Sequence, residues 1–500
     1  MFTLNRNQGV QFAPELPVQF KPESGVQFAP EYPINIPKLI SDIKDARRNH
    51  GVRIFNMSLV IPNAKKYNST FSRFAYELDK LAYEEDVLLF ISVGNFSDDS
   101  LKSLKEDFPH EDHEYPKFFY CLNTDSDSHV CEDTNICCPS ESLNNISVGA
   151  IAHNLENGDY SDVTPSPIYP AYYTRKFHID FSQAINGSKI NANSRNKNLN
   201  KPDFIMEGGD LFNYNSGMQI LRSTMVDAEK FYGRTCGTSL ATPLLTSYAA
   251  EILSHYPNIR TQSVKAMLMN SSGYHSKSAL PAYSEHSENL LKSLIGFGRP
   301  DKKKILATDN NSIAYLIEGE ITLEQIISYP IYIPAYMRTN GNKLQFDLSL
   351  SYSFNPIMDN HLSYLPLHIS FCLVKNLTID QIADTNKSFH GIKNGFAWSE
   401  DHFGIDNKVF SNAQKKSYKM QPTDIINADG SIAIAVRCLA KNNFIEQLRN
   451  QQHHFSLMVN VTEIISNENA NDINLFHEMM QINNYIEIEN NMDIDLETEA

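Results

Sequence analysis

The sequence lacks the features that would place a protein in a membrane or on nucleic acid. The first residues, Met1 to Arg6, are not followed by the apolar stretch of a secretory signal. No run approaches the ~18 apolar residues that a membrane-spanning helix needs. The net charge at pH 7 is −16, so the chain also lacks the basic excess that favours nucleic acid or anionic membrane surfaces. We therefore expect a cytoplasmic protein with neither kind of partner.

Cysteine is sparse and unevenly placed, which leaves the role of the thiols open. Three of the seven cysteines are scattered, and the other four lie within one short stretch: Cys121, Cys131, Cys137 and Cys138. Their spacing matches no common zinc motif, because two adjacent cysteines do not easily bind one metal ion. Free thiols in a surface insertion are the favoured interpretation, with two disulfides or a metal site as the alternatives.

An octapeptide is repeated three times near the start of the chain, within residues 9–32. Each copy carries a proline, which is incompatible with a helix or with a central strand. Three such short units cannot build a core. Residues 1–36 are therefore predicted to form an extended, flexible segment, either a peptide ligand for a partner or a duplication without function.

Alternating helices and strands are predicted over residues 37–300. The continuous apolar runs Val87–Val93 and Ile146–Ile151 are typical of strands that are buried on both faces of a parallel sheet. Residues 70–84 carry apolar side chains at helical spacing. This alternation favours a three-layer α/β domain.

A period of two replaces this pattern after about residue 305. Residues 344–350 alternate between apolar and polar side chains, and similar runs recur up to residue 461 without long helices between them. The pattern predicts a β-rich, sandwich-like domain over residues 301–480. The acidic, alternating end of the chain, residues 481–500, is either a solvated tail or an edge strand.

A candidate nucleophile lies in the segment from Gly237 to Pro243, which reads Gly-Thr-Ser-Leu-Ala-Thr-Pro. Ser239 stands where an apolar helix would begin, so its own N–H and the positive end of the helix dipole would lie beside an anion. The alternative is that Thr238 and Ser239 merely cap the helix. The whole segment resembles the serine motif Gly-Thr-Ser-x-Ala-x-Pro of the subtilisin family, the subtilases, which are serine peptidases.

Three more segments resemble the family in the expected order: Asn56-Met57-Ser58-Leu59-Val60, Phe90-Ile91-Ser92-Val93-Gly94-Asn95, and Lys201 to Gly209. The resemblance implies that Asn95 donates a hydrogen bond to the oxyanion of the reaction. It also implies that an extended substrate pairs with the chain through five residues: Ser58, Leu59, Ser92, Val93 and Gly94. Two departures are Val60 and Glu207, which replace the usual glycine and proline.

The resemblance also indicates which parts of a Ser-His-Asp triad are missing. The sequence contains neither Asp-Ser-Gly nor Asp-Thr-Gly, and its two His-Gly pairs begin at His50 and His390. His50 lies too close to Asn56 to be the catalytic base, and His390 lies in the β-rich half. We therefore expect the subtilisin-like domain to lack the first strands of its sheet, together with the Asp and the His of the triad.

Two functional hypotheses follow. In the first, the chain belongs to a subtilisin-like serine endopeptidase that cuts polypeptides with Ser239 as nucleophile, and the Asp and His come from upstream sequence or from a companion chain. In the second, it is a catalytically inactive pseudopeptidase or gene fragment that binds extended peptides. Whether the chain alone is an enzyme stays open. No cofactor is required; calcium would be compatible with the resemblance, but no acidic loop matches a site, and no metal ligand is assigned.

Overall fold

The protein is described from a computed structural model. The described residues are 34–66, 69–96, 115, 119, 133–156, 158, 160, 163–178, 200–210, 215–221, 232–273, 293–306, 311–339, 343–358, 364–374, 411–421, 429–464 and 475–483. The octapeptide repeats, Cys121, Cys131, His390 and residues 484–500 of the acidic end lie outside this set.

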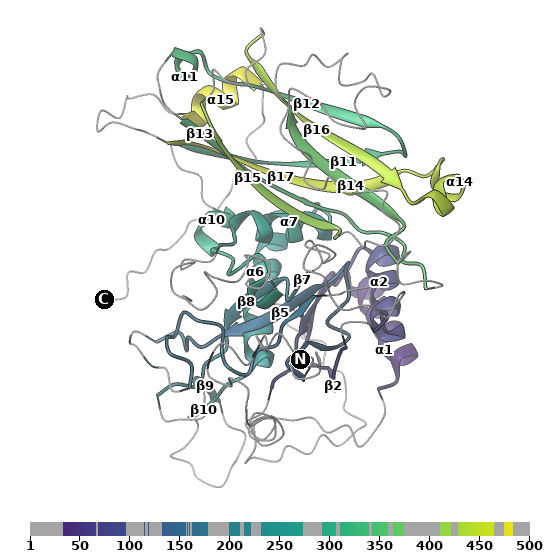
Figure 1. The fold of residues 1–500 in the computed structure, drawn as a ribbon, viewed down its shortest axis with the longest axis vertical. Helices are drawn as coiled ribbons and strands as arrows, with labels where there is room; N and C mark the ends of the chain where they lie inside the picture. The colour runs from purple at the N-terminus through teal and green to yellow at the C-terminus, as the bar shows by residue number, and fades with distance from the viewer. Residues whose placement is uncertain are drawn as a thin grey trace, which may run out of the picture.

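A four-stranded parallel sheet forms the centre of the N-terminal half (Figure 1). Its strands are β1 (Ile54–Met57), β3 (Leu88–Ser92), β5 (Ile146–Ile151) and β8 (Phe204–Glu207), in the order β1-β3-β5-β8. Every residue of β3, β5 and β8 is buried, as the continuous apolar runs predict for β3 and β5. The predicted α/β class with a parallel sheet is confirmed for this half.

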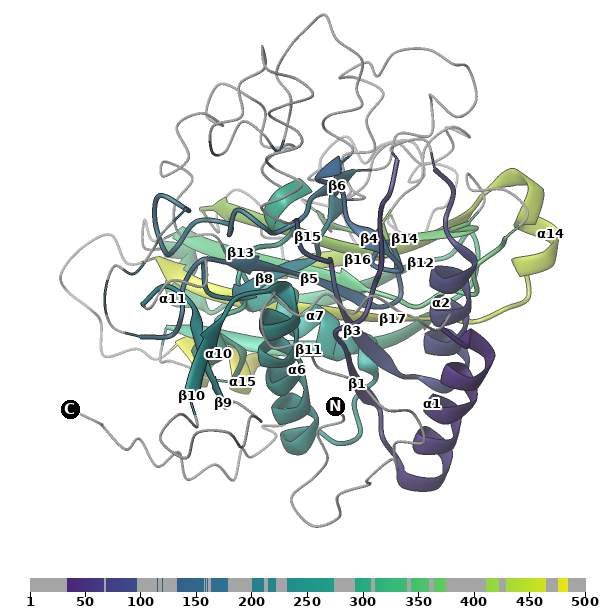
Figure 2. The ribbon, with the colours of Figure 1, turned by 90° about the horizontal axis from the view of Figure 1, so that it is seen from below.

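Helices cover both faces of this sheet (Figure 2). They are α1 (Ile36–His50), α2 (Arg73–Glu85), α6 (Thr238–His255) and α7 (Thr261–Ser271). Phe55 and Leu89 belong to a buried cluster with α1 and α2, whereas Leu88 and Phe90 belong to a cluster with α6 and α7. Because side chains alternate along a strand, the two clusters lie on opposite faces of the sheet. This half therefore has three layers.

Local capping explains where two of these helices begin. The Asn35 side chain accepts a hydrogen bond from the N–H of Lys38 (3.0 Å), and Ser72 Oγ accepts one from the N–H of Ala75 (3.1 Å). Each cap satisfies an N–H that has no partner within its own helix. The helix predicted for residues 70–84 thus begins at Arg73, because Ser72 is its cap.

Two antiparallel sheets make up most of the described C-terminal half (Figure 1). The first has the order β11-β17-β13-β15, with strands β11 (Ser312–Ile321), β17 (His453–Ile464), β13 (Lys343–Ser351) and β15 (Ala413–Met420). The second has the order β12-β16-β14, with strands β12 (Ile326–Tyr332), β16 (Ser431–Ala440) and β14 (Leu367–Val374). Phe346 and Phe371 come from different sheets and share one buried cluster, so the apolar faces of the sheets pack together.

The remaining described elements are short: β2 (Ile61–Ala64), β4 (Cys137–Cys138), β6 (Phe177–His178), β7 (Asn200–Lys201), β9 (Met218–Leu221), β10 (Tyr232–Thr235), α10 (Lys302–Leu306), α11 (Ala335–Thr339), the 3-10 helix η5 (Asn442–Phe444), α14 (Ile445–Leu448) and α15 (Leu475–Asn483). Strands β2 and β4, β6 and β7, and β9 and β10 form three small antiparallel pairs. None of the helices in the described ranges combines the length and the apolar character that crossing a lipid bilayer would take.

Buried polar contacts join the two halves of the chain. Lys415 of β15 donates to three main-chain carbonyls at the end of α7, at 2.6–3.1 Å. The Tyr364 hydroxyl donates to the Asp79 carboxylate of α2 at 2.7 Å. These contacts satisfy polar groups that would otherwise be buried without partners. They also anchor helices on both faces of the parallel sheet, which supports the site described next.

Candidate active site

Ser239 is held at the start of α6 by a sharp turn after β10. The turn residue Gly237 has φ of +155°, and a Cβ there would lie 3.1 Å from Asn95 Nδ2, so glycine is required. The Gly237 N–H donates to the carbonyl of Gly208, the residue after β8, at 3.0 Å. Ser239 is half-buried in the first turn of the helix. Its main-chain N–H and the positive end of the helix dipole can therefore act on an anion at this point.

Asn95 lies directly beside this turn. It follows β3, and its Oδ1 accepts hydrogen bonds from both the N–H and the hydroxyl of Thr238, each at 3.0 Å. Because the Thr238 N–H can only donate, these bonds identify the oxygen of the Asn95 amide and leave Nδ2 on the side of Gly237. Asn95 itself is exposed. Two residues that the sequence singles out, Ser239 and Asn95, therefore come from neighbouring segments of one site.

The end of β1 reaches the same helix turn. Ser58 Oγ donates to the carbonyl of Ser239 at 3.1 Å, and Asn56 Nδ2 donates to Ser58 Oγ at 3.3 Å. Parallel strands bring their carboxyl ends to one edge of a sheet, which explains why residues after β1 and β3 meet near Ser239. Ser58 and Leu59 are both half-buried there.

The segment after β3 is held by internal hydrogen bonds. The carbonyl of Ser92 accepts from Ser140 Oγ at 2.7 Å, and the carbonyl of Val93 accepts from the N–H of Cys137 at 3.0 Å. Ser92, Val93 and Gly94 are buried, whereas Asn95 is exposed. The role of Ser92, Val93 and Gly94 in substrate binding stays a prediction.

Two described thiols near the site, those of Cys137 and Cys138, have raised pKa values. Cys137 and Cys138 are unpaired cysteines. Burial raises the pKa of both thiols, in Cys138 to about 12, and the negative charge of Glu141 adds to this effect. Among the described residues, no group of three or more His, Cys, Asp or Glu side chains is arranged to hold a metal ion.

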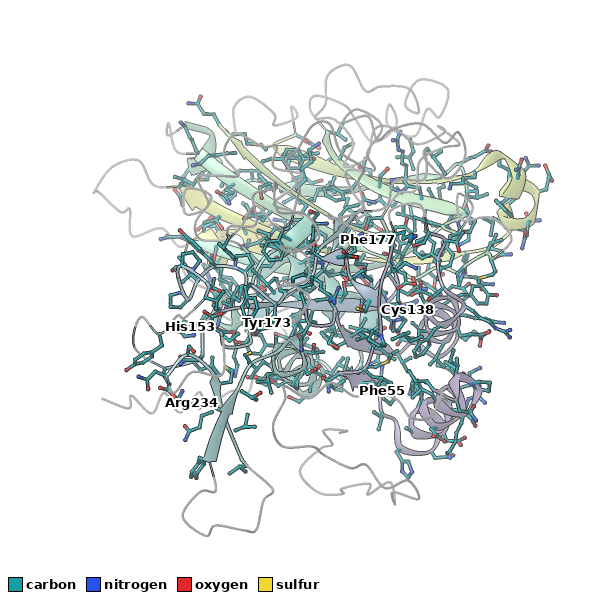
Figure 3. The ribbon with its side chains drawn as sticks, turned by 60° about the horizontal axis from the view of Figure 1, so that its bottom comes forward. Phe55, Cys138, His153, Tyr173, Phe177 and Arg234 are labelled. Atoms are coloured by element: carbon teal, nitrogen blue, oxygen red, sulfur yellow. The ribbon has the colours of Figure 1, made fainter. Side chains whose placement is uncertain are left out.

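Neither His50, His153 nor His255 is placed as a base for Ser239. His255 is the last residue of α6, so the length of this helix separates it from Ser239 in the first turn, and its Nδ1 lies 2.8 Å from the carbonyl of Glu251. His50 ends α1 and precedes β1, whereas Ser58 follows β1, so the length of the strand separates His50 from the site. His153 Nδ1 accepts from the N–H of Leu155 at 2.9 Å, and Figure 3 shows His153 well apart from Phe55 of β1. In the part of the chain that the structure describes, no histidine or carboxylate is hydrogen-bonded to the Ser239 hydroxyl.

The Lys-Pro-Asp segment, residues 201–203, is hydrogen-bonded to β5 through Asp203. Asp203 Oδ2 accepts from the N–H of Ser147 (2.7 Å) and from Lys201 Nζ (2.6 Å). Burial acts to raise the pKa of Asp203, but the positive charges of Lys201 and Lys265 outweigh it and keep this pKa below its usual value. Sequence reasoning missed Lys265, and likewise Arg299, which forms an ion pair with Glu207 at 2.5 Å. No motif marks either residue.

These observations define a class first: an α/β protein with a serine at a helix N-terminus and an asparagine amide beside it. That arrangement suits the stabilisation of an oxyanion. The chain belongs to the subtilase family, peptidase family S8, because the model of that family matches residues 31–298, more than half of the chain.

Four individual proteins resemble this chain at 12–22% identity. An uncharacterized protein, y4bN, of Sinorhizobium fredii is 22% identical over 382 residues, which are 73% of this chain and 82% of that one. Among solved structures, the protease MycP1 without its propeptide is 12% identical, covering 55% of this chain and 67% of its own, with a TM-score of 0.30. A lanthipeptide protease is 15% identical (54% and 66%; TM-score 0.30). The chain spans only 54% of a psychrophilic S41 protease, at 17% identity and a TM-score of 0.26.

Proposed function

We propose that this chain supplies the nucleophile and the oxyanion site of a serine endopeptidase that acts on polypeptides. Ser239 Oγ attacks the carbonyl carbon of the scissile peptide bond while its proton passes to a base. The oxyanion that forms accepts hydrogen bonds from Asn95 Nδ2 and from the N–H of Ser239. Its collapse expels the protonated amine, and water then hydrolyses the acyl-enzyme. The observation that carries this proposal is the double hydrogen bond from Thr238 to Asn95 Oδ1, which leaves Nδ2 as the donor.

The base and the carboxylate that orients it come, in this proposal, from a further polypeptide segment, either upstream sequence or a companion chain. The free edge of β1 is the place for it. The N–H of Leu88 bonds to the carbonyl of Arg53, so by alternation the main-chain groups of Ile54 and Asn56 face away from β3. No strand of the described residues pairs with that edge. A parallel strand added there would end near Ser58, beside the Ser239 turn.

Labelling with a fluorophosphonate probe tests the proposal. The purified chain is treated alone and together with the polypeptides encoded next to it, with Ser239→Ala as the control. We expect labelling at Ser239 that becomes much faster when the partner is present, since a base raises the reactivity of the hydroxyl. Failure to label under either condition would exclude serine peptidase chemistry.

A binding function without cleavage is the second candidate. It is favoured by one observation: within the described residues, the Ser239 hydroxyl has no hydrogen bond to a histidine or a carboxylate. Such a protein would hold extended peptides beside Ser58 and Leu59 by strand pairing. Binding of a fluorescent peptide library by the unlabelled chain, unchanged in Ser239→Ala, would favour this candidate over the first.

We also infer that residues 301–480 form a second, sandwich-like domain. The inference is supported by the two antiparallel sheets and by the single cluster that their apolar faces share. Limited proteolysis tests it: stable fragments that begin near residue 300 are expected, and cleavage throughout this half would contradict the inference.

A further inference from the structure

A buried arginine lies directly behind the Asn95 turn. Arg175 is 7% exposed. Its Nη2 donates to the carbonyl of Asn95 at 3.0 Å, and its Nη1 donates to the carbonyls of Asp133 (2.9 Å) and Asn135 (2.8 Å). Among the contacts of the described residues, every hydrogen bond of this guanidinium goes to a main-chain carbonyl.

The surrounding packing leaves the Asn95 turn little freedom. The guanidinium lies over the Phe96 ring, 5.8 Å from its centroid, and the N–H of Phe96 donates to the carbonyl of Tyr173 at 2.7 Å. On the other side, Gly94 has φ of +88°, and a Cβ there would meet Cys137 Sγ at 3.0 Å. Arginine, cysteine and glycine thus fit together with no room for a further atom.

A simple space-filling role does not explain a cation at this position. Burial of a charge is costly, and burial indeed lowers the pKa of Arg175, although the electrostatic effects of Cys137 and Asp133 act in the opposite direction. A methionine would fill the same volume at no electrostatic cost. What an arginine adds is a rigid fork with several donors, which can hold carbonyls of two separate segments at once. The carbonyl of Asn95 is the one of the three that belongs to the site.

We propose that Arg175 is a positioning residue for the oxyanion donor Asn95. Asn95 lies beyond the end of β3, so the sheet does not hold its peptide group. Arg175 fixes its carbonyl, and Thr238 fixes its side-chain oxygen. Because the main-chain carbonyl and the side-chain oxygen of Asn95 are both hydrogen-bonded, the orientation of Nδ2 is fixed before substrate binds. A preorganised oxyanion donor requires such a fixed orientation. This inference rests on the proposed function of Asn95.

A double-mutant cycle on the rate of fluorophosphonate labelling tests the role, with the companion segment present. Asn95→Ala should lower the rate by about 10²–10³-fold, as is typical for one oxyanion donor. Arg175→Met should lower it by roughly 10–100-fold through misplacement of that donor, and Arg175→Lys by less. The Arg175→Met, Asn95→Ala double variant should be no slower than Asn95→Ala alone. An equal Arg175→Met effect in both backgrounds, or no effect in folded protein, would overturn the proposal.

Hydrogen exchange gives a second readout that needs no reactive serine. The N–H of Thr238 is bonded to Asn95 Oδ1, far in sequence from Arg175. Arg175→Met should therefore speed exchange of the Thr238 amide, and Arg175→Lys should partly restore its protection. Arg47→Met is the matched control, because Arg47 also donates to a main-chain carbonyl, that of Glu85, but lies in α1. Unchanged exchange at Thr238 in Arg175→Met would refute the positioning role, whether or not the wild-type protein is labelled. Failure of the wild-type protein to label would instead count against the proposed function.

Discussion

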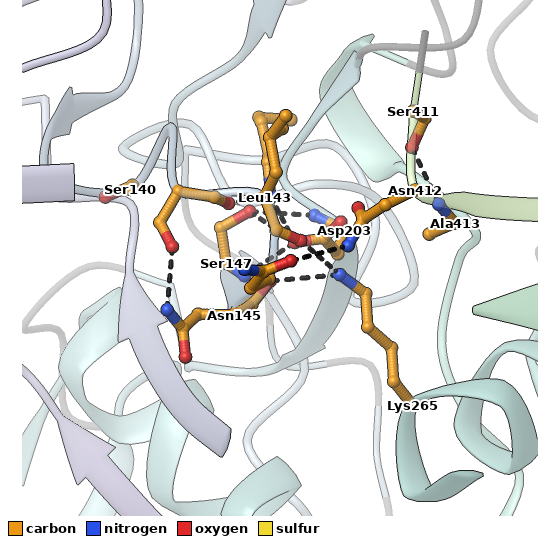
Figure 4. Close-up of polar contacts among 12 residues, drawn as sticks. Ser140, Leu143, Asn145, Ser147, Asp203, Lys265, Ser411, Asn412 and Ala413 are labelled. Atoms are coloured by element: carbon orange, nitrogen blue, oxygen red, sulfur yellow. Dashed lines mark hydrogen bonds and ion pairs between the residues drawn. The ribbon is translucent and has the colours of Figure 1, made fainter. Parts of the chain in front are cut away.

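Replacing Lys265 with methionine should change how the stability of the protein depends on pH. Lys265 of α7 is fully buried, and its Nζ donates to the carbonyls of Leu143 (2.8 Å) and Asn145 (3.1 Å), as Figure 4 shows. Burial lowers the pKa of Lys265 to about 8; the nearby charge of Asp203 acts in the opposite direction, and that of Lys201 reinforces the decrease.

The sign and size of the effect follow from this pKa. A lysine in the unfolded chain has a pKa of about 10.4. Between about pH 8 and that value, the unfolded state therefore binds more protons than the folded state. Deprotonated Lys265 therefore makes its full contribution to the free energy of unfolding at a pH above the pKa of the unfolded chain. This contribution is lost as the pH falls through about 8, where Lys265 becomes charged in the folded protein. The difference between the two pKa values corresponds to about 3 kcal/mol in full, and to about 2 kcal/mol at pH 9.5.

Urea unfolding of wild-type protein and Lys265→Met at pH 7, 8.5 and 9.5 measures this contribution. The comparison cancels the tyrosines and lysines that titrate in both proteins. We expect wild-type protein to gain about 2 kcal/mol relative to the variant between pH 7 and 9.5. Lys302→Met is the control, because the Lys302 side chain is 51% exposed and should show no such gain. A difference that stays constant or falls with pH would refute the reasoning.

Three further predictions concern the packing around the site and between the halves. Gly94→Ala should lower the free energy of unfolding by at least about 2 kcal/mol, because the new Cβ contacts Cys137 and the positive φ also disfavours alanine. Gly51→Ala is the control, since it has the same backbone cost but its Cβ would lie in open space. An equal loss of stability for both variants in thermal unfolding would contradict this prediction. Lys415→Met should cost about 2–4 kcal/mol in urea unfolding, since it leaves carbonyls at the end of α7 without their donor, and a loss no larger than that of the exposed Lys419→Met would count against it. Cys138 should resist iodoacetamide at pH 8 in folded protein, because a pKa of about 12 leaves roughly one thiolate in 10⁴. Mass spectrometry should find Cys138 modified only after unfolding. Rapid modification of the folded protein would contradict this prediction, because it would show that the thiol is accessible and ionised.

The sequence was most informative where one local property determines the structure. The runs Val87–Val93 and Ile146–Ile151 are apolar apart from one serine each, and each contains a strand that is buried on both faces. The proximity of Asn95 to the Ser239 turn could also be expected, because a family motif places both. Arg175 could not be found in this way. Its carbonyl partners lie in segments far away in sequence, and neither periodicity nor a motif distinguishes it from a surface arginine.

Asn95 and the proposed entry point for a base are held by different parts of the molecule. Asn95, the proposed oxyanion donor, is held within the described chain: Thr238 donates to its side-chain oxygen, and Arg175 donates to its main-chain carbonyl. The proposed entry point for a base is the outer edge of β1, and Ser58, just after this strand, is hydrogen-bonded to the helix turn at Ser239. Because Arg175 and Thr238 make no contact with that edge in the described hydrogen bonds, the donor can be in place before a base arrives. A partner would then complete a preformed site rather than build one, and the protection of the Thr238 amide should be the same with and without it.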